Sequence, residues 1–379
     1  MKNILITGGA GFIGSNLALK LIDKGYKVTV LDNLSKQIHG DDPVVTSPLY
    51  QTIKNKVTFI EGSITDKHKV AEALKDIDTI VHLAAETGTG QSMYEIEKYA
   101  QVNVGGTALL LDILANDKNY QVKKIIIASS RSIYGEGKYL SENGEVFYPE
   151  HRVSATMDAG DFEVKHPQTG ASLTLVATDE DSKIHPSSVY GITKQNQEQM
   201  VMTVCPTIGI APVAFRYQNV YGPGQSLTNP YTGILSIFST LIKNDKSINI
   251  FEDGLESRDF VFIDDVVNAT ILGLEKDEAN GNVFNVGTGV PTNVIQVAEA
   301  LITNYGISVP VRISGNYRLG DIRHNYADIT KIKQKLGFVP IVSFEEGIKK
   351  FTSWVNDQDV QEDKYEQSIK EMKDKGLFK

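Results

Sequence analysis

Short apolar runs alternate with amphipathic segments through the first two-thirds of this chain. After a first run that starts at residue 3, strand-like runs recur at 27–31, 57–61, 79–84, 123–129 and 212–215. Segments with helical spacing lie between them, notably 100–115 and 189–204. Such alternation is typical of parallel strands joined by right-handed crossovers. The pattern therefore predicts an α/β fold built on a doubly wound parallel sheet.

Two interruptions of this rhythm divide the chain. Residues 137–185 have few regularly spaced apolar positions, so we expect an insertion that folds over one edge of the site mouth. After Val220 the pattern becomes irregular, and we expect 221–355 to form a smaller substrate-binding lobe, interleaved with a first domain of residues 1–220. The tail, 356–379, is rich in charges and carries Tyr365, Ile369 and Met372 at helical spacing, which predicts a surface helix.

The first apolar run leads into a glycine-rich turn and a helix. Glycines permit the sharp turn and a close approach of backbone to a pyrophosphate, and the helix start offers free N–H groups. Asp32 ends the next apolar run, where a carboxylate can accept from both hydroxyls of a ribose and would repel a 2′-phosphate. The pattern is the Rossmann dinucleotide-binding fingerprint and predicts NAD rather than NADP. The residues expected to bind it are Gly8, Gly11, Phe12, Ile13, Gly14, Asp32 and Asn33.

A tyrosine and a lysine stand four residues apart, at Tyr190 and Lys194. At this spacing both side chains project from one face of a helix. A tyrosine that takes a hydroxyl proton near neutral pH needs its pKa lowered, and we expect the Lys194 ammonium and the nicotinamide ring to do this. Ser130 ends a predicted central strand, the edge where ligands bind in such sheets. Ser130, Tyr190 and Lys194 are therefore the predicted catalytic residues, with Tyr190 and Lys194 also touching the cofactor.

Composition narrows the class of protein. The 379 residues carry 38 basic and 47 acidic side chains, a net charge of −9, and no basic cluster, so no nucleic-acid partner is expected. No apolar run reaches the ~18 residues that span a bilayer, so no membrane partner is expected. Cys205 is the one cysteine, and a strand at residue 3 leaves no room for a signal peptide, so we expect a cytoplasmic protein. No cluster has metal-ligand spacing, and no metal is predicted.

Several segments together resemble the extended short-chain dehydrogenase/reductases, in their nucleotide-sugar epimerase and dehydratase branch. The resemblance extends to about Trp354, and it implies a tightly held NAD and a homodimer paired through helices such as 100–115 and 189–204. The segments are 82–85 (HLAA), 103–107 (NVGGT), 216–223 (RYQNVYGP), 257–261 (SRDFV), 284–287 (FNVG) and 336–338 (LGF).

The resemblance also assigns further residues to the site. To the cofactor it adds Ser63, Ile64, Leu83, Ala84, Ala85 and Tyr217. To the substrate, a nucleotide-diphosphate sugar, it assigns Gln91, Ser92, Ser130, Ser132, Asn219, Gln225, Arg258 and Arg318, together with the loop 225–233. Arginines suit a diphosphate through forked, charge-assisted hydrogen bonds. For Arg258 the alternative is a surface ion pair with Asp259, and for Arg318 the alternatives are the nearby Arg312 and Arg323.

Arg131 and Ser132 narrow the choice between the two reaction types of this branch, dehydration and epimerisation. Dehydratases of this branch place a carboxylic acid there to expel a hydroxyl, and neither residue can do so, which leaves epimerisation. Segments 85–94, 129–137 and 221–234 are similar to the dTDP-L-rhamnose 4-epimerases, which implies C4 epimerisation to dTDP-6-deoxy-L-talose through a 4-keto sugar. The alternatives are epimerisation at C2 or C4 of a CDP-, GDP- or UDP-sugar, a net ketosugar reductase or dehydrogenase, and a non-catalytic NAD-binding protein.

Some polar residues are expected to be structural. His82 is interpreted as a satisfied core histidine and Asn103 as a buried amide that tethers loops. Asp66 and Asp265 are each expected to cap a helix. Cys205 is expected to be a small buried hydrophobic side chain rather than a nucleophile.

Overall fold

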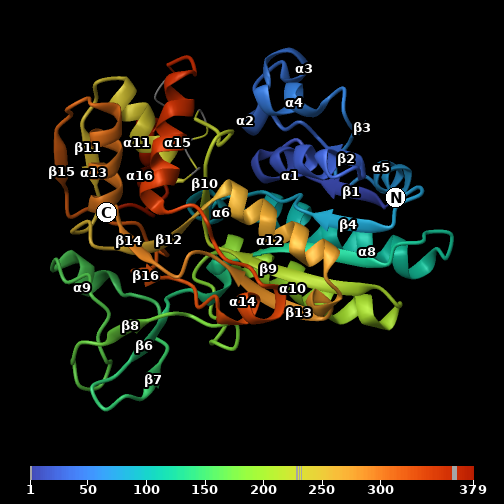
Figure 1. Cartoon of the computed structure of the whole chain (residues 1–379). Coiled ribbons are helices and arrows are strands. Elements are labelled where there is room, and N and C mark those ends of the chain that lie inside the picture. The colour runs from blue at the N-terminus through green and yellow to red at the C-terminus, as the bar shows by residue number, and fades with distance from the viewer. Residues whose placement is uncertain (1, 228, 230, 232, 361–364) are drawn as a thin grey trace.

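One parallel sheet organises the molecule. In the computed structural model, which describes residues 2–227, 229, 231, 233–360 and 365–379, seven strands pair in the order β13-β9-β5-β4-β1-β2-β3 (Figure 1). The strands are β1 Asn3–Thr7, β2 Lys27–Asp32, β3 Thr58–Glu61, β4 Thr79–His82, β5 Lys124–Ser130, β9 Ala211–Tyr217 and β13 Asn282–Val286. The chain order reverses between β1 and β4, which opens a crevice at their carboxyl ends. The predicted doubly wound sheet is confirmed.

Alternating strand residues explain how both faces of the sheet are covered. Ile4 and Ile6 of β1 belong to one buried cluster and Leu5 to another, because successive side chains point to opposite faces. Helices α1 Phe12–Asp23, α4 Pro48–Ile53 and α12 Ile263–Glu275 contribute to the first cluster. Helices α5 Lys67–Ala73, α8 Gly106–Asn116 and α10 Val189–Thr207 contribute to the second. Cys205 is completely buried in that second cluster, as expected.

The predicted helix over 100–115 differs in one detail. It begins as a π-helical turn, η1 Ala100–Gly105, before continuing as α8. Short helices connect the strands around the crevice: α2 Lys36–His39, α3 Pro43–Thr46, α6 Thr89–Ser92, α7 Ile96–Tyr99 and the 3-10 turn η2 Arg131–Tyr134. None of the helices in the described part of the chain combines the length and apolar character that a membrane crossing requires.

The later part of the chain forms smaller sheets and a second group of helices. Strands β10 Asn219–Tyr221, β12 Ser257–Phe262, β14 Pro291–Asn293 and β16 His324–Asn325 form one sheet, and β11 Ile248–Ile250 pairs with β15 Val311–Ile313. The helices here are α11 Ile234–Lys243, η3 Asp277–Ala279, α13 Val294–Tyr305, α14 Thr330–Leu336, α15 Phe344–Asn356 and α16 Tyr365–Asp374. Strand β13 nevertheless pairs within the main sheet, and α12 packs on one face of that sheet. The later part of the chain is therefore interleaved with the part that forms the other six strands.

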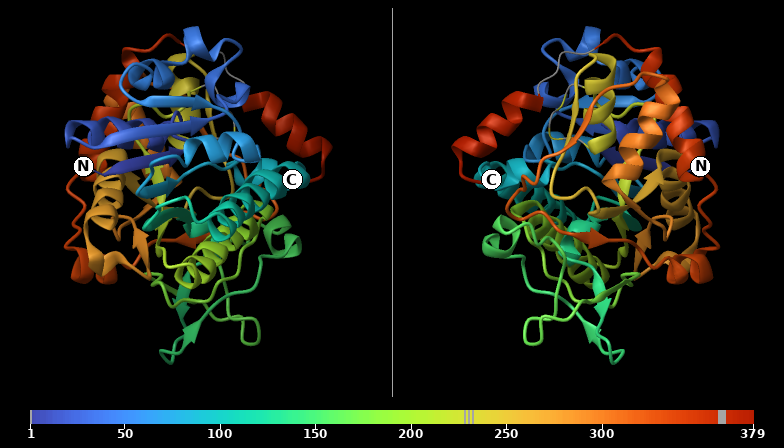
Figure 2. Two further views of the ribbon diagram at one scale, coloured as in Figure 1. Left: turned by 90° about the vertical axis from the view of Figure 1, so that its right-hand side faces the viewer. Right: turned by 90° about the vertical axis from the view of Figure 1, so that its left-hand side faces the viewer.

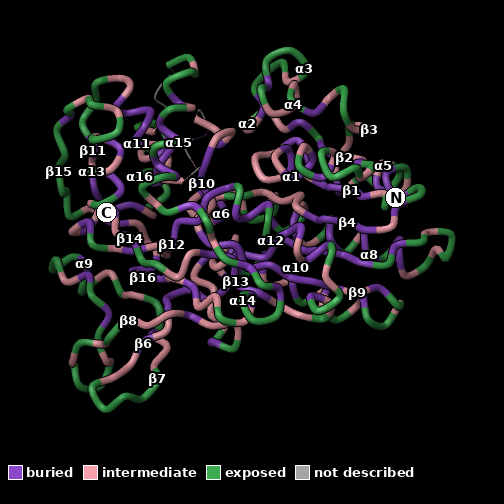
Figure 3. Tube along the Cα trace, viewed as in Figure 1, coloured by how far each residue is buried: buried purple, intermediate pink, exposed green. Residues whose placement is uncertain are grey.

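The segment 137–185 projects from the body of the molecule. It contains β6 Lys138–Leu140, β7 Val146–Phe147, β8 Thr174–Val176 and the short helix α9 Ser154–Asp158, and the strands form a small antiparallel sheet. In both views of Figure 2 this segment, drawn in green, extends below the rest of the chain. Figure 3 shows mainly exposed and half-buried residues here, in contrast with the buried strands of the main sheet.

Candidate active site

The glycine turn after β1 leaves no space for side chains. Gly8 has a φ of +69°, and a Cβ there would lie 2.8 Å from the backbone of Ala84. A Cβ at Gly14 would lie 2.5 Å from the carbonyl oxygen of Gly8. Contacts this short with backbone atoms are not tolerated, so these positions require glycine. The turn is therefore a bare backbone surface at the start of α1, the kind of cradle that receives a pyrophosphate.

Asp32 lies at the end of β2, beside this turn. One carboxylate oxygen accepts from the backbone N–H of Ala10 at 2.9 Å and the other from that of Leu34, also at 2.9 Å. Burial raises the pKa of Asp32, and these hydrogen bonds together with His39 oppose the rise. The Nε2 atom of His39 lies 3.8 Å from the carboxylate. The carboxylate is thus fixed in orientation, with lone pairs left for a ribose.

A cavity of about 420 Å³ begins at the glycine turn and passes over the carboxyl ends of the central strands. Every residue that we predicted from the sequence to bind the cofactor lines this cavity. They are Gly8, Gly11, Phe12, Ile13, Gly14, Asp32, Asn33, Ser63, Ile64, Leu83, Ala84, Ala85, Tyr190, Lys194 and Tyr217. A glycine cradle at the start of α1 and the buried carboxylate of Asp32 beside it fit an NAD molecule.

Ser130, Tyr190 and Lys194 meet at the far end of this cavity. Ser130 ends β5, and its Oγ accepts from the Ser132 backbone N–H at 3.1 Å and from the Ser132 hydroxyl at 2.9 Å. Tyr190 and Lys194 lie in the first turns of α10, which Ser188 caps by accepting from the Gly191 N–H. Ser130 and Tyr190 line both this cavity and the second cavity described below. The geometry brings the three predicted catalytic residues together.

The electrostatics of this trio include one group that the sequence did not assign to the site. Burial raises the pKa of Tyr190, and Ser130 and the charge of Arg131 lower it. Lys194 is itself buried, which lowers its pKa to about 7, and its Nζ donates to Gln197 at 2.8 Å. Arg131 therefore adds a charge that favours the phenolate, while the expected effect of Lys194 and the nicotinamide ring stays a prediction.

A buried polar chain positions Lys194. Gln197, which accepts from Lys194, donates to the Thr107 hydroxyl at 2.8 Å, and Thr107 lies 2.9 Å from His82 Nε2. The other ring nitrogen of His82 lies 2.6 Å from the Thr7 hydroxyl. Burial lowers the pKa of His82 to about 3, so the ring is neutral. This confirms the satisfied core histidine and links β1, β4 and α8 to the catalytic helix.

A second cavity, of about 230 Å³, adjoins the first where Ser130 and Tyr190 line both. Among the predicted substrate residues it contains Ser130, Ser132, Asn219 and Gln225. The described residues that line it are Thr89, Ser130, Arg131, Ser132, Tyr190, Gln218, Asn219, Val220, Gln225, Gly233, Leu235 and Phe260. Of the predicted sugar-contacting loop 225–233, residues 228, 230 and 232 lie outside the described part of the chain. Two cavities that share a tyrosine and a serine can present two ligands to one another at those groups.

Comparison with known proteins agrees with this geometry. A sequence model of the NAD dependent epimerase/dehydratase family matches residues 4–154 and 167–287. The chain belongs to this family. Membership confirms the predicted family resemblance, the predicted class of enzyme and the predicted cofactor, NAD.

Individual members of the family are similar over nearly the whole chain. A dTDP-L-rhamnose 4-epimerase of Burkholderia thailandensis is 36% identical over 93% of this chain and 95% of its own. A UDP-glucose 4-epimerase of Thermotoga maritima, solved with UDP-glucose, has a TM-score of 0.73 and 32% identity over 93% of this chain and 98% of its own. A UDP-glucuronic acid 4-epimerase of Bacillus cereus, solved with UDP-glucuronic acid and NAD, has a TM-score of 0.75 and 26% identity over 93% and 99%.

Two of the predicted substrate residues, Gln91 and Ser92, line neither of the two cavities. Gln91 is 5% exposed and exchanges hydrogen bonds with Gln37, and it also accepts from the Tyr99 hydroxyl. Ser92 is completely buried and accepts from the Tyr190 backbone N–H at 3.0 Å. Neither lines either of the two cavities described above, so in this structure they support residues that do, and their direct contact with a sugar stays a prediction.

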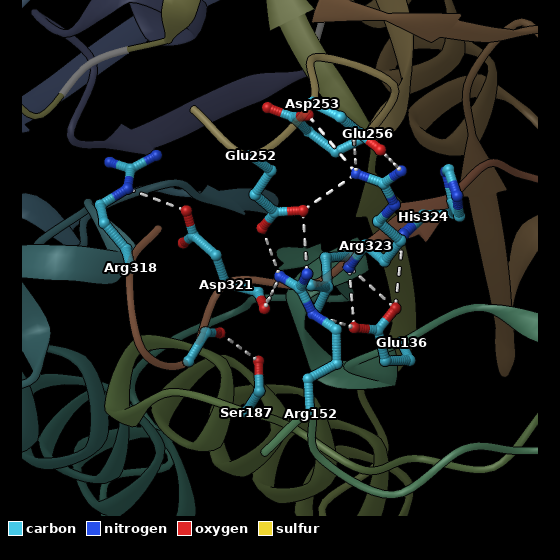
Figure 4. A network of polar contacts seen from close by, with 12 residues as sticks. Glu136, Arg152, Ser187, Glu252, Asp253, Glu256, Arg318, Asp321, Arg323 and His324 are labelled. Atoms are coloured by element: carbon cyan, nitrogen blue, oxygen red, sulfur yellow. Dashed lines mark hydrogen bonds and ion pairs between the residues drawn. The ribbon is translucent and has the colours of Figure 1, made fainter. Parts of the chain in front are cut away.

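The two predicted diphosphate arginines are also engaged elsewhere. Arg258 donates to the backbone carbonyls of Ser257, Ile322 and Arg323 and not to Asp259, so the alternative ion pair with Asp259 is wrong, while its contact with a diphosphate stays a prediction. Arg318 forms an ion pair with Asp321 at 2.8 Å, as Figure 4 shows. Neither arginine lines a cavity.

The alternative arginine, Arg323, is the centre of a buried ionic network (Figure 4). It is completely buried and pairs with Glu163 of the projecting segment and with Glu252 and Asp253 after β11. Arg152 also pairs with Glu252, at 2.8 Å. No residue of 137–185 lines either cavity, so this segment is anchored through the network rather than at the site mouth.

The remaining structural expectations have mixed outcomes. Asn103 donates to the Glu86 carbonyl and the Thr193 hydroxyl, which confirms a loop-tethering amide. Asp66 accepts from two N–H groups at the start of α5, which confirms a cap. Asp265 instead lies within α12 and accepts from the N–H groups of Ile341 and Val342, so the capping prediction is wrong. The described residues contain no cluster of three or more side chains that could hold a metal.

Helix α16 contacts a residue of the first cavity wall. Tyr231 lines the cavity, and its hydroxyl donates to Glu371 of α16 and accepts from Tyr94 at 2.8 Å. Met372 of the same helix is buried. The charged tail predicted to be a surface helix therefore forms a helix over 365–374 whose inner face supports a cavity wall.

Proposed function

We propose that this protein is an NAD-dependent nucleotide-sugar epimerase that interconverts dTDP-L-rhamnose and dTDP-6-deoxy-L-talose by inverting C4. The observation that carries the proposal is the meeting of the two cavities at Ser130 and Tyr190. A nucleotide sugar in the second cavity would present its reacting carbon to a cofactor in the first. The 36% identity to a dTDP-L-rhamnose 4-epimerase supports this choice of sugar.

The chain supplies the proton chemistry of this reaction. When bound, NAD+ supplies a reversible hydride acceptor. Tyr190 takes the proton of the sugar hydroxyl as its carbon is oxidised to a ketone, and Ser130 donates a hydrogen bond to the same oxygen. Lys194 is placed to hold the nicotinamide ribose. The ketosugar then turns within the second cavity, and Tyr190 returns the proton as the carbon is reduced on its opposite face.

The second cavity favours epimerisation over dehydration. A dehydratase needs an acid that protonates a leaving hydroxyl, and no Asp or Glu side chain lines this cavity in the described part of the chain. The residues that follow Ser130 into the cavity are Arg131 and Ser132. Neither is an acid that can protonate a leaving group near neutral pH.

A UDP-sugar 4-epimerase is the second candidate. The solved relatives of Thermotoga maritima and Bacillus cereus are named for UDP-glucose and UDP-glucuronic acid, and both match 93% of this chain. Both candidates use the same residues and differ in the nucleotide and the sugar.

Incubation with a panel of nucleotide sugars decides between these candidates. The purified enzyme is mixed with dTDP-L-rhamnose, UDP-glucose, UDP-glucuronic acid and a GDP- and a CDP-sugar, and the ring coupling constants are followed by NMR. We expect dTDP-L-rhamnose to give the C4 epimer with no free NADH at 340 nm. Turnover of a UDP-sugar alone would select the second candidate, and stoichiometric NADH would indicate a dehydrogenase.

The proposal includes a homodimer in the cytoplasm. Ile96 of α7 and Ile192 of α10 are 54% and 46% exposed, although both helices pack on the main body. Large apolar side chains exposed on adjacent elements suit a helix-to-helix interface between two copies. The cytoplasm is supported by the single cysteine.

A further inference from the structure

Arg131 occupies an unusual position between the catalytic strand and the second cavity. It follows Ser130 directly, opens the turn η2 and lines the second cavity. Its Nε donates to Asn219 Oδ1 at 2.6 Å, a hydrogen bond that ties the side chain to β10. The hydrogen bond fixes the direction of the guanidinium and leaves its terminal nitrogens as donors.

No carboxylate of the described residues forms an ion pair with Arg131. The acids that act on it at longer range are already engaged: Asp321 pairs with Arg318, and Glu136 accepts from the Arg323 backbone. Burial and the like charge of Arg258 lower the pKa of Arg131 to about 9. Arg131 is half-buried in the wall of the second cavity, and no hydrogen bond joins its terminal nitrogens to the described residues, so they can donate to a ligand there.

Arg131 and the catalytic tyrosine line the same cavity, the second one. The other ionisable group beside Tyr190 is Tyr99 of α7, whose ring centroid lies 6.5 Å from that of Tyr190. Tyr99 is neutral, because burial raises its pKa, and Lys194 on the same helix as Tyr190 donates to Gln197. The charge of Arg131 lowers the pKa of the Tyr190 phenol with which it shares the cavity.

We propose that Arg131 is a further catalytic residue, which donates hydrogen bonds to oxygens of the sugar and stabilises the phenolate of Tyr190. The inference rests on the proposed epimerase function. In the oxidation, the sugar O–H bond breaks and a Tyr190 O–H bond forms while the carbon gives a hydride to NAD+; the reduction reverses each change. A guanidinium has donors only, and hydroxyl and ketone oxygens both accept, so Arg131 can serve the sugar in both of its orientations.

The pH dependence of turnover tests this role. Arg131→Met and Arg131→Lys are compared with the wild type and with Arg312→Met, which removes an equal charge from an exposed strand. For Arg131→Met we expect kcat/KM at pH 7 to fall about 100-fold and its acid limb to move up by about one pH unit. Arg131→Lys should restore most of the limb, and Arg312→Met should leave the profile unchanged. An unchanged acid limb in Arg131→Met would overturn the proposal.

A second readout does not depend on the sugar. Titration of NAD-loaded enzyme at 295 nm, with Tyr190→Phe as the blank, reports the phenolate of Tyr190 directly. We expect it to form at higher pH in Arg131→Met and, if that variant does not fold, in Asn219→Leu, which removes the acceptor that orients Arg131. If no nucleotide sugar in the panel is converted, the proposed function fails, while this titration still decides the role of Arg131: equal phenolate pKa values would refute it.

Discussion

Tyr190 and Lys194 illustrate what side-chain spacing reveals and what it leaves open. The four-residue spacing correctly placed both side chains at one cavity, because it depends only on helix geometry. The electrostatic partner could not be read in this way. It depends on the turn η2, which places Arg131 in the same cavity as Tyr190 from 59 positions earlier in the sequence (190 minus 131).

Replacing Tyr190 by Phe removes the proposed proton acceptor without changing the shape of the side chain. We expect kcat to fall by about 10²–10⁴-fold, the usual contribution of a general acid–base. The content of bound NAD and the thermal midpoint should stay close to those of the wild type. Turnover is measured by NMR on the active nucleotide sugar. Tyr120→Phe, which removes a hydroxyl that donates to Ala71 far from the cavity, is the matched control; full activity in Tyr190→Phe would exclude the tyrosine from the reaction.

His82 predicts how stability changes with pH. Its folded pKa of about 3 lies below the ordinary value of 6.5 because the ring is buried. Between these values the unfolded chain binds a proton that the folded protein does not, so the free energy of unfolding falls as pH falls from about 6.5 to about 3, by up to about 1.4 kcal/mol per pH unit.

Thermal midpoints measured from pH 7.5 to 5 test this linkage. We expect the wild type to lose more stability on acidification than His82→Gln, so that the two midpoints converge at low pH. His68→Gln, at an exposed position, should follow the wild type. Parallel curves for the wild type and His82→Gln would show that the ring does not contribute.

At the scale of elements, the strand and helix pattern predicted six of the seven strands of the main sheet. The predicted runs correspond to β1, β2, β3, β4, β5 and β9, because apolar runs in parallel strands are buried on both faces. The seventh strand, β13, was not predicted, because the apolar pattern is irregular after Val220. The hydrogen bonds of Arg258 could not be predicted either. Its acceptors are carbonyls of Ile322 and Arg323 on a distant segment, and every residue type carries a carbonyl, so no sequence signal marks them.

The ionic network around Arg323 makes the projecting segment depend on the second lobe. Arg323→Met leaves the carboxylates of Glu163, Glu252 and Asp253 without their shared cation, and we expect a loss of about 3–5 kcal/mol in the free energy of unfolding. Limited proteolysis should then cut first within 142–172. Arg312→Met, on an exposed strand, should change neither measurement. Wild-type resistance in Arg323→Met would mean that the segment is held by its own small sheet.

At the scale of the whole molecule, the proposed dimer can be tested at Ile192. A glutamate there would place a charge in the proposed interface, where desolvation is costly. We expect Ile192→Glu to elute as a monomer in size-exclusion chromatography with light scattering, while the wild type elutes as a dimer. Val290→Glu, at a loop position that is 58% exposed, should leave the mass unchanged. Equal masses for all three proteins would place any interface elsewhere.

The position of α16 links the last residues of the chain to the wall of the cofactor cavity. Glu371 holds Tyr231 in the wall of the first cavity, and Lys379 exchanges backbone hydrogen bonds with Tyr317, at 2.8 and 3.0 Å. An expression tag fused after Lys379 would begin at a residue whose backbone is hydrogen-bonded to Tyr317. A chain truncated before α16 would lose Glu371, the residue to which the Tyr231 hydroxyl donates. Engineers of this enzyme should therefore place tags at the other terminus.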